Sequence, residues 1–282
     1  MVIFKLIKEV KTHLKTLKKQ GKTVGFVPTM GALHQGHVSL IKACKTDNDV
    51  SICSIFVNPT QFNEKKDFTN YPVTIEADIL KLEKAGCNIL FMPSVKEMYP
   101  TGLKNRSKIN FGFIAETLEG EFRPGHFDGM IQIVEKLLKV VEPDKLYMGQ
   151  KDYQQQLLVR ALIKKRKFKT ELVMCPILRE KDGLAMSSRN VRLDKASRKL
   201  AVELSKTLKG VKAAIHHPKS NIDQAQEWGV KRLAGKKGIE TEYFEIRNAE
   251  TLKLPKSKKE KLVALVAAKI GGVRLIDNML LN

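Results

Sequence analysis

The sequence predicts an α/β protein with a doubly wound, Rossmann-like parallel sheet, followed by a smaller α+β domain. Over about the first 180 residues, apolar β-branched runs alternate with stretches of helical periodicity, which is typical of βαβ units. Glycines interrupt the first strand-to-helix junction, where such domains bind phosphates. Beyond residue 183, helices precede strands, which favours a separate domain. We expect domains over residues 1–183 and 184–282.

The first domain is expected to alternate strands with helices. Residues 23–27 and 50–57 are apolar and β-branched, as in buried strands. The helical periodicity of 37–45 and the turn residues at 47–49 complete a βαβ unit between them. Further helices are expected at 74–85, 129–141 and 152–166, and further strands at 88–92, 145–148 and 171–175.

The second domain is expected to contain two helices and then three strands. The helices are expected at 194–215 and 222–234, and the strands at 240–246, 262–270 and 273–276. Ligands of doubly wound domains bind at the carboxyl ends of the parallel strands. Functional residues are therefore expected mainly in the loops that follow strands of the first domain.

Composition indicates a globular protein of a reducing compartment. The chain has 282 residues, of which 43% are hydrophobic and 29% charged, as in ordinary globular domains. Its first residues lack the long apolar stretch of a signal peptide, and no run of some 18 apolar residues is present. The four cysteines are scattered and form no C-x-x-C pair. A cytoplasmic location without a membrane partner is the expectation.

The formal charge of +21 raises the alternative of a nucleic-acid-binding protein. The lysines of residues 256–261, however, are mixed with acids and carry little aromatic interleaving, as on a solvated face. The densest basic patch, 164–169, coincides with the expected end of a helix, where cations offset the helix dipole. Nucleic acid is not the expected partner.

The most informative stretch is 28–37, in which His34 and His37 lie three residues apart at the strand-to-helix junction. A helix start offers free N–H groups and a positive dipole end to phosphates, and glycines permit close approach. His37 is followed by Val38, where a P-loop would need lysine and a hydroxyl residue. Imidazoles there suit attack at an α-phosphorus, so the stretch indicates adenylation.

Two alternatives remain for these histidines. Histidines at this spacing can bind a metal, but no third ligand of the H-E-x-x-H type follows. The second alternative is packing at a helix start without a ligand, because short motifs occur by chance.

Polar residues follow two further strands. Asn58 and Gln61 stand where the strand over 50–57 ends, and their amides could bind hydroxyls or a carboxylate, although Asn-Pro also opens ordinary turns. Residues 149–152 follow a later strand with a glycine, a lysine for phosphate charge and Asp152, which could equally cap the helix. Gln155 lies three residues after Asp152 and is expected on the same helix face.

Two more segments complete the pattern. Residues 123–127 place Arg123 and His126 on one loop. Residues 186–190 supply two hydroxyls and a guanidinium, which suit phosphate oxygens. A capping or turn role would also explain the serines of the second segment.

Together these segments closely resemble the pantothenate synthetases, the pantoate–β-alanine ligases of the coenzyme A pathway, within the H-x-G-H nucleotidyltransferases. Five motifs stand in family order and spacing: P-T-M-G-A-L-H-x-G-H, F-V-N-P-x-Q-F, R-P-G-H-F, G-x-K-D-x-Q-Q and S-S-R-N. The resemblance runs through residue 278, nearly the whole chain. Many members have glutamate where Gln150 stands, so this chain departs from the family pattern at that position.

The resemblance implies ATP-dependent adenylation of pantoate, loss of pyrophosphate, and attack by β-alanine to give pantothenate and AMP. It implies ATP as a substrate, Mg²⁺ held mainly by the phosphates, no protein metal site, a homodimer, and a C-terminal domain that acts as a lid. His37 is then the expected proton donor or oxyanion stabiliser, with His34 and Lys151 as electrostatic partners. A cytidylyl- or adenylyltransferase, which would retain the nucleotide in its product, is the enzymatic alternative.

By position, the resemblance assigns two sets of binding residues. The ATP-binding set is Met30, Gly31, Ala32, Leu33, His34, Gln35, Gly36, His37, Gly149, Gln150, Lys151, Asp152, Leu178 through its backbone, Met186, Ser187, Ser188 and Arg189. The substrate-binding set is Gln61 and Gln155, with Asn58, Tyr71, Arg123 and His126 nearby.

Overall fold

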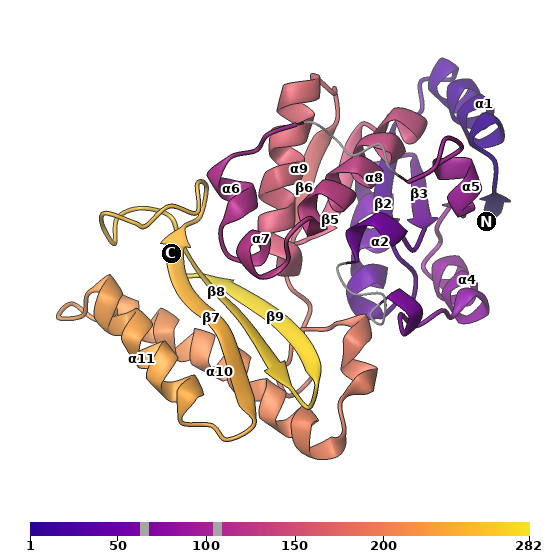
Figure 1. Cartoon of the computed structure of the whole chain (residues 1–282). Coiled ribbons are helices and arrows are strands. Elements are labelled where there is room, and N and C mark those ends of the chain that lie inside the picture. Colours follow the sequence, from indigo (N-terminus) through magenta and orange to yellow (C-terminus); the bar gives the residue numbers. More distant parts are fainter. Residues whose placement is uncertain (63–67, 104–108) are drawn as a thin grey trace. The chain divides into compact units, whose positions relative to one another are not determined.

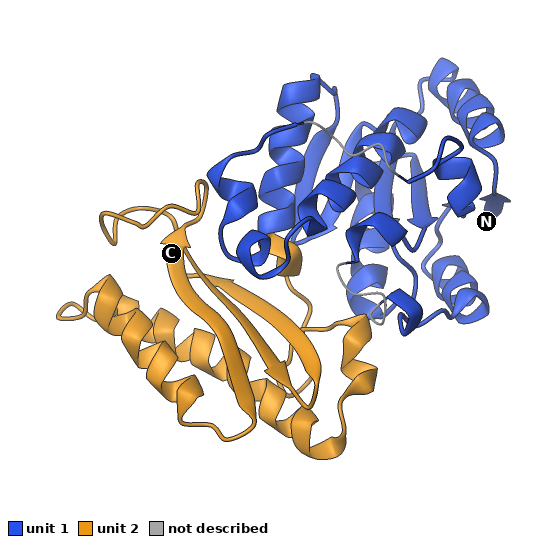
Figure 2. Cartoon of the chain, viewed as in Figure 1, with its two compact units in different colours: residues 1–149, 154–176 blue, residues 150–153, 177–282 orange. Residues whose placement is uncertain are grey.

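A computed structural model describes residues 1–62, 68–103 and 109–282 of the chain (Figure 1). The chain divides into two compact units (Figure 2). Unit 1 comprises Met1–Gly149 and Gln154–Pro176, and unit 2 comprises Gln150–Tyr153 and Ile177–Asn282. The chain thus passes into unit 2 for four residues after the strand that ends at Gly149, in addition to its C-terminal part.

Unit 1 contains a six-stranded sheet in the order β1-β4-β3-β2-β5-β6, and every pairing is parallel. The strands are β1 (Val2–Phe4), β2 (Val24–Thr29), β3 (Val50–Ile55), β4 (Ile89–Phe91), β5 (Lys145–Gly149) and β6 (Glu171–Cys175). Strands β3 and β4 extend from β2 in one direction, whereas β5 and β6 extend in the other. The topological switch point, where such folds bind ligands, therefore lies between β2 and β5.

Helices cover both faces of this sheet. They are α1 (Ile7–Lys19), α2 (Gln35–Asp47), α4 (Ile75–Lys84), α5 (Val95–Met98), α6 (Phe113–Glu116), α7 (Glu119–Phe122), α8 (His126–Val141) and α9 (Tyr153–Arg166), with a 3₁₀ turn η1 (Pro59–Gln61). Along β3, Ile52 packs into the core shared with α1, α8 and α9, and Cys53 packs into the core shared with α2 and α4. This alternation of buried residues on two faces makes the sheet doubly wound, as predicted.

Unit 2 places two helices on a three-stranded antiparallel sheet of order β7-β8-β9. Its elements are η2 (Gln150–Asp152), η3 (Ser188–Arg192), α10 (Lys195–His216), α11 (Ile222–Ala234), β7 (Ile239–Asn248), β8 (Leu262–Ile270) and β9 (Val273–Leu280). Buried residues of both helices and all three strands form one core. The predicted α+β character of the C-terminal part is confirmed.

Some elements differ from the prediction. Strand β1 and helix α1 were not among the predicted elements, nor were the short helices α5, α6 and α7. Helix α8 begins at His126, earlier than the expected 129, and β9 extends to Leu280. Among the described helices, none combines the length and the apolar character that crossing a bilayer requires.

Candidate functional site

The loop after β2 turns sharply before α2 begins. Gly31 has φ +82° and Ala32 has φ +48°, a left-handed conformation that glycine adopts readily and other residues rarely. The Thr29 hydroxyl donates to the Ser54 carbonyl at 2.7 Å and accepts the Gly31 N–H at 3.2 Å. The turn therefore brings the chain from the sheet edge directly into the start of α2.

The two histidines of the motif form a reciprocal cap at that start. His34 is the N-cap residue, and its Nδ1 accepts the Gly36 N–H at 3.1 Å. His37 Nδ1 in turn accepts the His34 N–H at 3.2 Å, and the ring centroids are 4.0 Å apart. Histidines thus occupy the two positions of a capping box. Because each Nδ1 accepts a hydrogen bond, the neutral rings carry their proton on Nε2.

Asp78 of α4 holds the same loop from the other side. Its carboxylate oxygens accept the Ala32 and Leu33 N–H groups, each at 2.8 Å. Lys81 lies 3.8 Å from this carboxylate and donates to the Leu33 carbonyl at 2.6 Å. Asp78 is 1% exposed, so its charge is offset by these donors and not by water.

We expect Asp78→Asn to slow adenylate formation by about tenfold, because an amide offers one acceptor where the carboxylate oxygens now hold two N–H groups. Single-turnover release of pyrophosphate measures the effect. Glu76→Gln, the same charge change at an exposed position of the same helix, is the matched control. Equal rates for the two variants would contradict a role of Asp78 in holding the loop.

Gln61, at the end of η1, is held by its neighbours. The buried Asn58 side chain donates to Gln61 Oε1 at 3.2 Å and to the Gly129 carbonyl at 3.0 Å. Its Oδ1 accepts the hydroxyls of Tyr99 at 2.7 Å and Thr60 at 3.2 Å. The amide of Asn58 therefore forms its hydrogen bonds with other protein groups. This favours a role in orienting Gln61 and not a direct contact with a substrate.

Unit 1 brings this turn together with the loop over residues 30–34, which joins β2 to α2. Gln61 Nε2 lies 2.8 Å from Met30 Sδ. His126, at the first turn of α8, approaches the Gln61 carbonyl through Nδ1 at 2.7 Å, and its Nε2 is 3.0 Å from Arg123 Nη1. Since the guanidinium can only donate, Nε2 accepts and Nδ1–H donates to Gln61. Arg123 also pairs with Glu119 at 3.6 Å.

Gly129 of α8 allows the turn to approach the helix. A Cβ atom at this position would lie 2.1 Å from the Thr60 carbonyl oxygen and 2.7 Å from the Gln61 nitrogen. Both are backbone atoms, so the turn or the helix would have to move. The absence of a side chain at Gly129 therefore determines how closely Gln61 packs on α8.

We expect Gly129→Ala to lower the free energy of unfolding by about 1–3 kcal/mol, the usual cost of overpacking, and to weaken pantoate binding. Gly210→Ala is the control, because its Cβ would lie 2.2 Å from the Trp228 ring on α11, within unit 2. Denaturant unfolding and calorimetry measure the two effects. If Gly129→Ala loses stability without any change in pantoate affinity, the close packing at Gly129 does not determine the position of Gln61.

Three consecutive glutamines of α9 differ in their surroundings. Gln154 and Gln156 are 3% and 1% exposed. Gln154 Nε2 donates to the carbonyls of Ile114 and Thr117 at 2.6 and 2.7 Å, and Gln156 Nε2 donates to the Met148 carbonyl at 3.1 Å. Gln155 is only half-buried, which makes it the glutamine of this set best placed to meet a ligand.

Tyr71, the remaining residue of the expected substrate-binding set, is buried, and its ring centroid lies 5.7 Å from that of Phe62.

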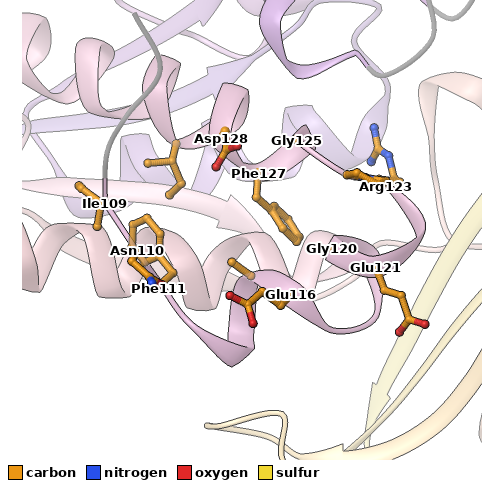
Figure 3. Close-up of a pocket in the computed structure, with 13 residues that line it drawn as sticks. Ile109, Asn110, Phe111, Glu116, Gly120, Glu121, Arg123, Gly125, Phe127 and Asp128 are labelled. Carbon is orange, nitrogen blue, oxygen red and sulfur yellow. The ribbon is translucent and has the colours of Figure 1, made fainter.

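Among the described residues of unit 1, two cavities adjoin segments that the sequence singled out. One, of about 320 Å³, adjoins the loop that joins β2 to α2 and is lined by residues 30–32, 55–57, 72–75 and 92–95, with Phe68 and Asp78. The other, of about 510 Å³, lies between residues 109–111 and the segment from α6 to α8 (Figure 3). Its wall carries Arg123 but also Glu116, Glu121 and Asp128. Three carboxylates disfavour an anionic ligand in this second cavity. The first cavity is lined mainly by apolar side chains, with Asp78 as the charged residue among them.

The remaining expected ATP-binding residues lie in unit 2, except Gly149, which ends β5. Lys151 and Asp152 are in η2, with Lys151 Nζ 3.8 Å from the Asp152 carboxylate. The Leu178 carbonyl accepts the Met186 N–H at 3.0 Å, which closes a loop between them. Ser187 caps η3 by accepting the Arg189 N–H at 3.3 Å. The capping alternative for Ser187 is therefore confirmed as one of its roles.

The four cysteines are buried, free thiols. Burial raises the pKa of the Cys44 thiol to about 12 and raises the pKa of Cys53, Cys87 and Cys175 as well, so all four remain protonated near neutral pH. Throughout residues 1–62, 68–103 and 109–282, no three His, Cys, Asp or Glu side chains are grouped to hold a metal ion.

Sequence reasoning missed Asp78 and Gly129. Asp78 looks like any acidic residue in the first turn of a helix. Gly129 stands at the start of the predicted helix over 129–141, where a glycine is unremarkable, so its close approach to Thr60 and Gln61 is seen only in the folded chain.

Comparisons with known proteins find relatives over the whole chain. The family model for pantoate-beta-alanine ligase matches residues 2–280. A pantothenate synthetase of Cytophaga hutchinsonii is 44% identical over 283 residues, which cover 100% of this chain and 99% of the relative. The crystal structure of pantothenate synthetase from Thermus thermophilus superimposes with a TM-score of 0.94 at 36% identity, covering 100% and 99% of the two chains.

A second solved structure is a ligand complex. Pantoate-beta-alanine ligase from Francisella tularensis, complexed with beta-gamma ATP and beta-alanine, matches with a TM-score of 0.82 at 39% identity. The match covers 100% of this chain and 98% of that one.

Proposed function

Because this chain belongs to the pantoate–β-alanine ligase family, whose activity is the ATP-dependent condensation of pantoate with β-alanine, we propose how its residues carry out that reaction. A pantoate carboxylate oxygen attacks the α-phosphorus of ATP, and pyrophosphate leaves. The β-alanine amine then attacks the acyl carbon of the pantoyl adenylate, which gives pantothenate and releases AMP. The observation that carries the assignment of residues is the histidine cap at the start of α2.

In this proposal His37 and His34 act as hydrogen-bond donors through Nε2. Their Nδ1 atoms are engaged by backbone N–H groups, so Nε2–H is the group that each neutral ring can offer to a phosphate oxygen. Charge builds on those oxygens as the carboxylate attacks, and a preorganised donor stabilises it. His37 then serves as the oxyanion stabiliser, and the start of α2 adds the positive end of its dipole.

We assign pantoate to Gln61 and Gln155. The Gln61 side chain is oriented by Asn58, and its main chain by His126, which Arg123 holds in turn. Asn58, Arg123 and His126 are therefore proposed as positioning residues, with Tyr71 in the same neighbourhood. Amides suit a substrate that carries both hydroxyls and a carboxylate, because they can donate and accept.

The cations of unit 2 are assigned to ATP. Lys151 and Arg189, with Ser187, Ser188 and the Leu178 backbone, are proposed to bind the nucleotide. Two anions must approach each other in the first step, and fixed cations offset that repulsion. Mg²⁺ is proposed to arrive with ATP and to take its ligands mainly from the triphosphate, since hard oxygen donors are what it prefers.

Three further proposals rest on family membership alone. They are a homodimer, a lid role for residues 184–282, and a cytoplasmic location.

The proposal is tested by incubating the purified protein with ATP, Mg²⁺ and pantoate, with and without β-alanine. We expect AMP and pantothenate to accumulate in equal amounts only when both acids are present. Binding of ATP without either product would contradict the ligase assignment and favour a nucleotidyltransferase that retains the nucleotide in its product.

A further inference from the structure

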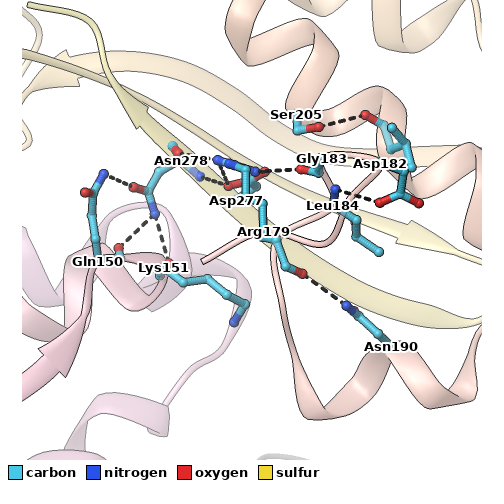
Figure 4. A network of polar contacts seen from close by, with 12 residues as sticks. Gln150, Lys151, Arg179, Asp182, Gly183, Leu184, Asn190, Ser205, Asp277 and Asn278 are labelled. Carbon is cyan, nitrogen blue, oxygen red and sulfur yellow. Dashed lines mark hydrogen bonds and ion pairs between the residues drawn. The ribbon is translucent and has the colours of Figure 1, made fainter. Parts of the chain in front are cut away.

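Two consecutive residues of β9 connect the segments of unit 2 that carry the proposed ATP-binding groups. Asn278 is 2% exposed and contacts η2, which contains Lys151. Asp277 is 3% exposed and contacts Arg179, which follows Leu178 in the loop closed by Met186. Figure 4 shows both sets of contacts.

Asn278 uses its whole amide on η2. Its Nδ2 donates to the carbonyls of Gln150 at 3.0 Å and Lys151 at 2.9 Å, and its Oδ1 accepts Gln150 Nε2 at 3.1 Å. A single 3₁₀ turn has little intrinsic stability. The two bonds to backbone carbonyls therefore fix the backbone from which the Lys151 side chain extends, and the third holds the Gln150 side chain.

Asp277 holds the other segment, the loop over residues 178–186. Arg179 donates to its two carboxylate oxygens at 2.7 and 2.9 Å, a two-pronged geometry that only arginine provides. The same guanidinium donates to the Gly183 carbonyl at 3.1 Å, across the loop. The Asn278 N–H donates to Asp277 Oδ1 at 2.8 Å, which couples the two anchors.

We propose that Asp277 and Asn278 are positioning residues for adenylation, which hold residues 150–152 and the 178–186 loop in register with each other. This inference rests on the proposed ATP-binding roles of Lys151 and Leu178. It predicts that loss of the Asn278 amide changes the use of ATP and leaves the use of pantoate nearly unchanged, because Gln61 and Gln155 belong to unit 1.

The test compares Asn278→Ala and Asn278→Asp with the wild type in steady-state assays of AMP formation. Both variants lose the two N–H donors, so we expect the KM for ATP to rise and kcat to fall by about tenfold each, on the scale of lost buried hydrogen bonds. The KM for pantoate should stay within about twofold of wild type. Equal changes in both KM values, or none, would overturn the proposal.

Asn282→Ala is the matched control. Asn282 also uses its amide on backbone groups of unit 2, the carbonyls of Lys258 and Glu260 and the Leu262 N–H, but it holds no proposed ATP-binding segment. We expect a loss of thermal stability without the selective effect on ATP. The same kinetic change in Asn282→Ala would show that general loosening of unit 2 is sufficient, and would overturn the proposal.

Two additional variants keep the outcomes separable. If the Asn278 variants do not fold, Arg179→Lys provides the test. This variant retains the charge next to Asp277 but loses the two-pronged contact, so it should raise the KM for ATP selectively. An unchanged KM for ATP would overturn the proposal.

Lys151→Met tests the underlying assignment of Lys151 to ATP. Wild-type kinetics in Lys151→Met would remove the proposed role of Lys151, whereas impaired Lys151→Met beside normal Asn278→Ala would overturn only the present inference.

Discussion

Replacing His37 with alanine is expected to slow adenylate formation by about 10²-fold or more, the usual effect of losing an acid–base group or an oxyanion donor. The substitution removes the Nε2–H that the proposal directs at the reacting phosphate. It also removes the Nδ1 acceptor of the His34 N–H. Single-turnover release of pyrophosphate, at saturating ATP and pantoate, measures the rate before β-alanine acts.

His37→Gln separates the two roles of this residue. Glutamine is a favoured residue at the third position of a capping box and can accept the His34 N–H, so it should restore the thermal stability that His37→Ala loses. The imidazole donor stays absent, and we expect the rate to remain at least about tenfold below wild type. If His37→Gln recovers both the full rate and the thermal stability, the only role of His37 is to cap α2, and the proposed stabilisation of the phosphate is contradicted.

Replacing Gln61 with alanine is expected to weaken pantoate binding by about 10- to 100-fold, since a hydrogen bond to a charged group contributes roughly 1.5–3 kcal/mol. The affinity for ATP should change by no more than about twofold. Asn58 and His126, which orient Gln61, remain in place in this variant. Isothermal calorimetry with each substrate measures the two affinities.

The control for Gln61→Ala is Gln20→Ala, which shortens an exposed glutamine at the end of α1. It should leave both affinities unchanged. Equal losses of pantoate and ATP affinity in Gln61→Ala would refute a direct pantoate contact. That result would instead point to the contact between Gln61 and Met30 as the cause, acting through the loop that joins β2 to α2.

Much of the fold follows from local periodicity. The apolar runs that predict β2 and β3 and the helical spacing within α8 are properties of short windows of sequence, and the structure confirms these elements. The strand β1 has only three residues, which is too short for a periodic signal. Helix α1 is rich in lysine and buries only Val10 and Leu14, so its apolar face is narrow.

The residues of the candidate site could be predicted where a short sequence motif contains them. His34, His37 and Gln61 were named from their residue types and their places after strands, and the structure locates them at those places. Asp78 binds the Ala32 N–H across a separation of 46 residues. Only the folded chain reveals such a contact, because it depends on how α4 packs and not on any local pattern.

The same holds for the residues that we propose to position the site. From the sequence, Asn58 was a candidate for binding hydroxyls or a carboxylate, with an ordinary turn as the alternative. In the structure its amide forms hydrogen bonds with Gln61, Gly129, Tyr99 and Thr60. The contacts of Asn278 with η2 span more than a hundred residues of sequence. Residue type indicates that an amide forms hydrogen bonds, and the tertiary structure determines with which groups.

The most direct test of the central claim, attack of the pantoate carboxylate on the α-phosphorus, follows an oxygen label. Pantoate labelled with ¹⁸O in its carboxylate is converted with ATP and β-alanine, and the AMP and inorganic phosphates are analysed by mass spectrometry. We predict that AMP carries one ¹⁸O atom, because the oxygen that bridges carbon and phosphorus leaves with AMP. Unlabelled AMP, or ADP together with labelled orthophosphate, would contradict the account.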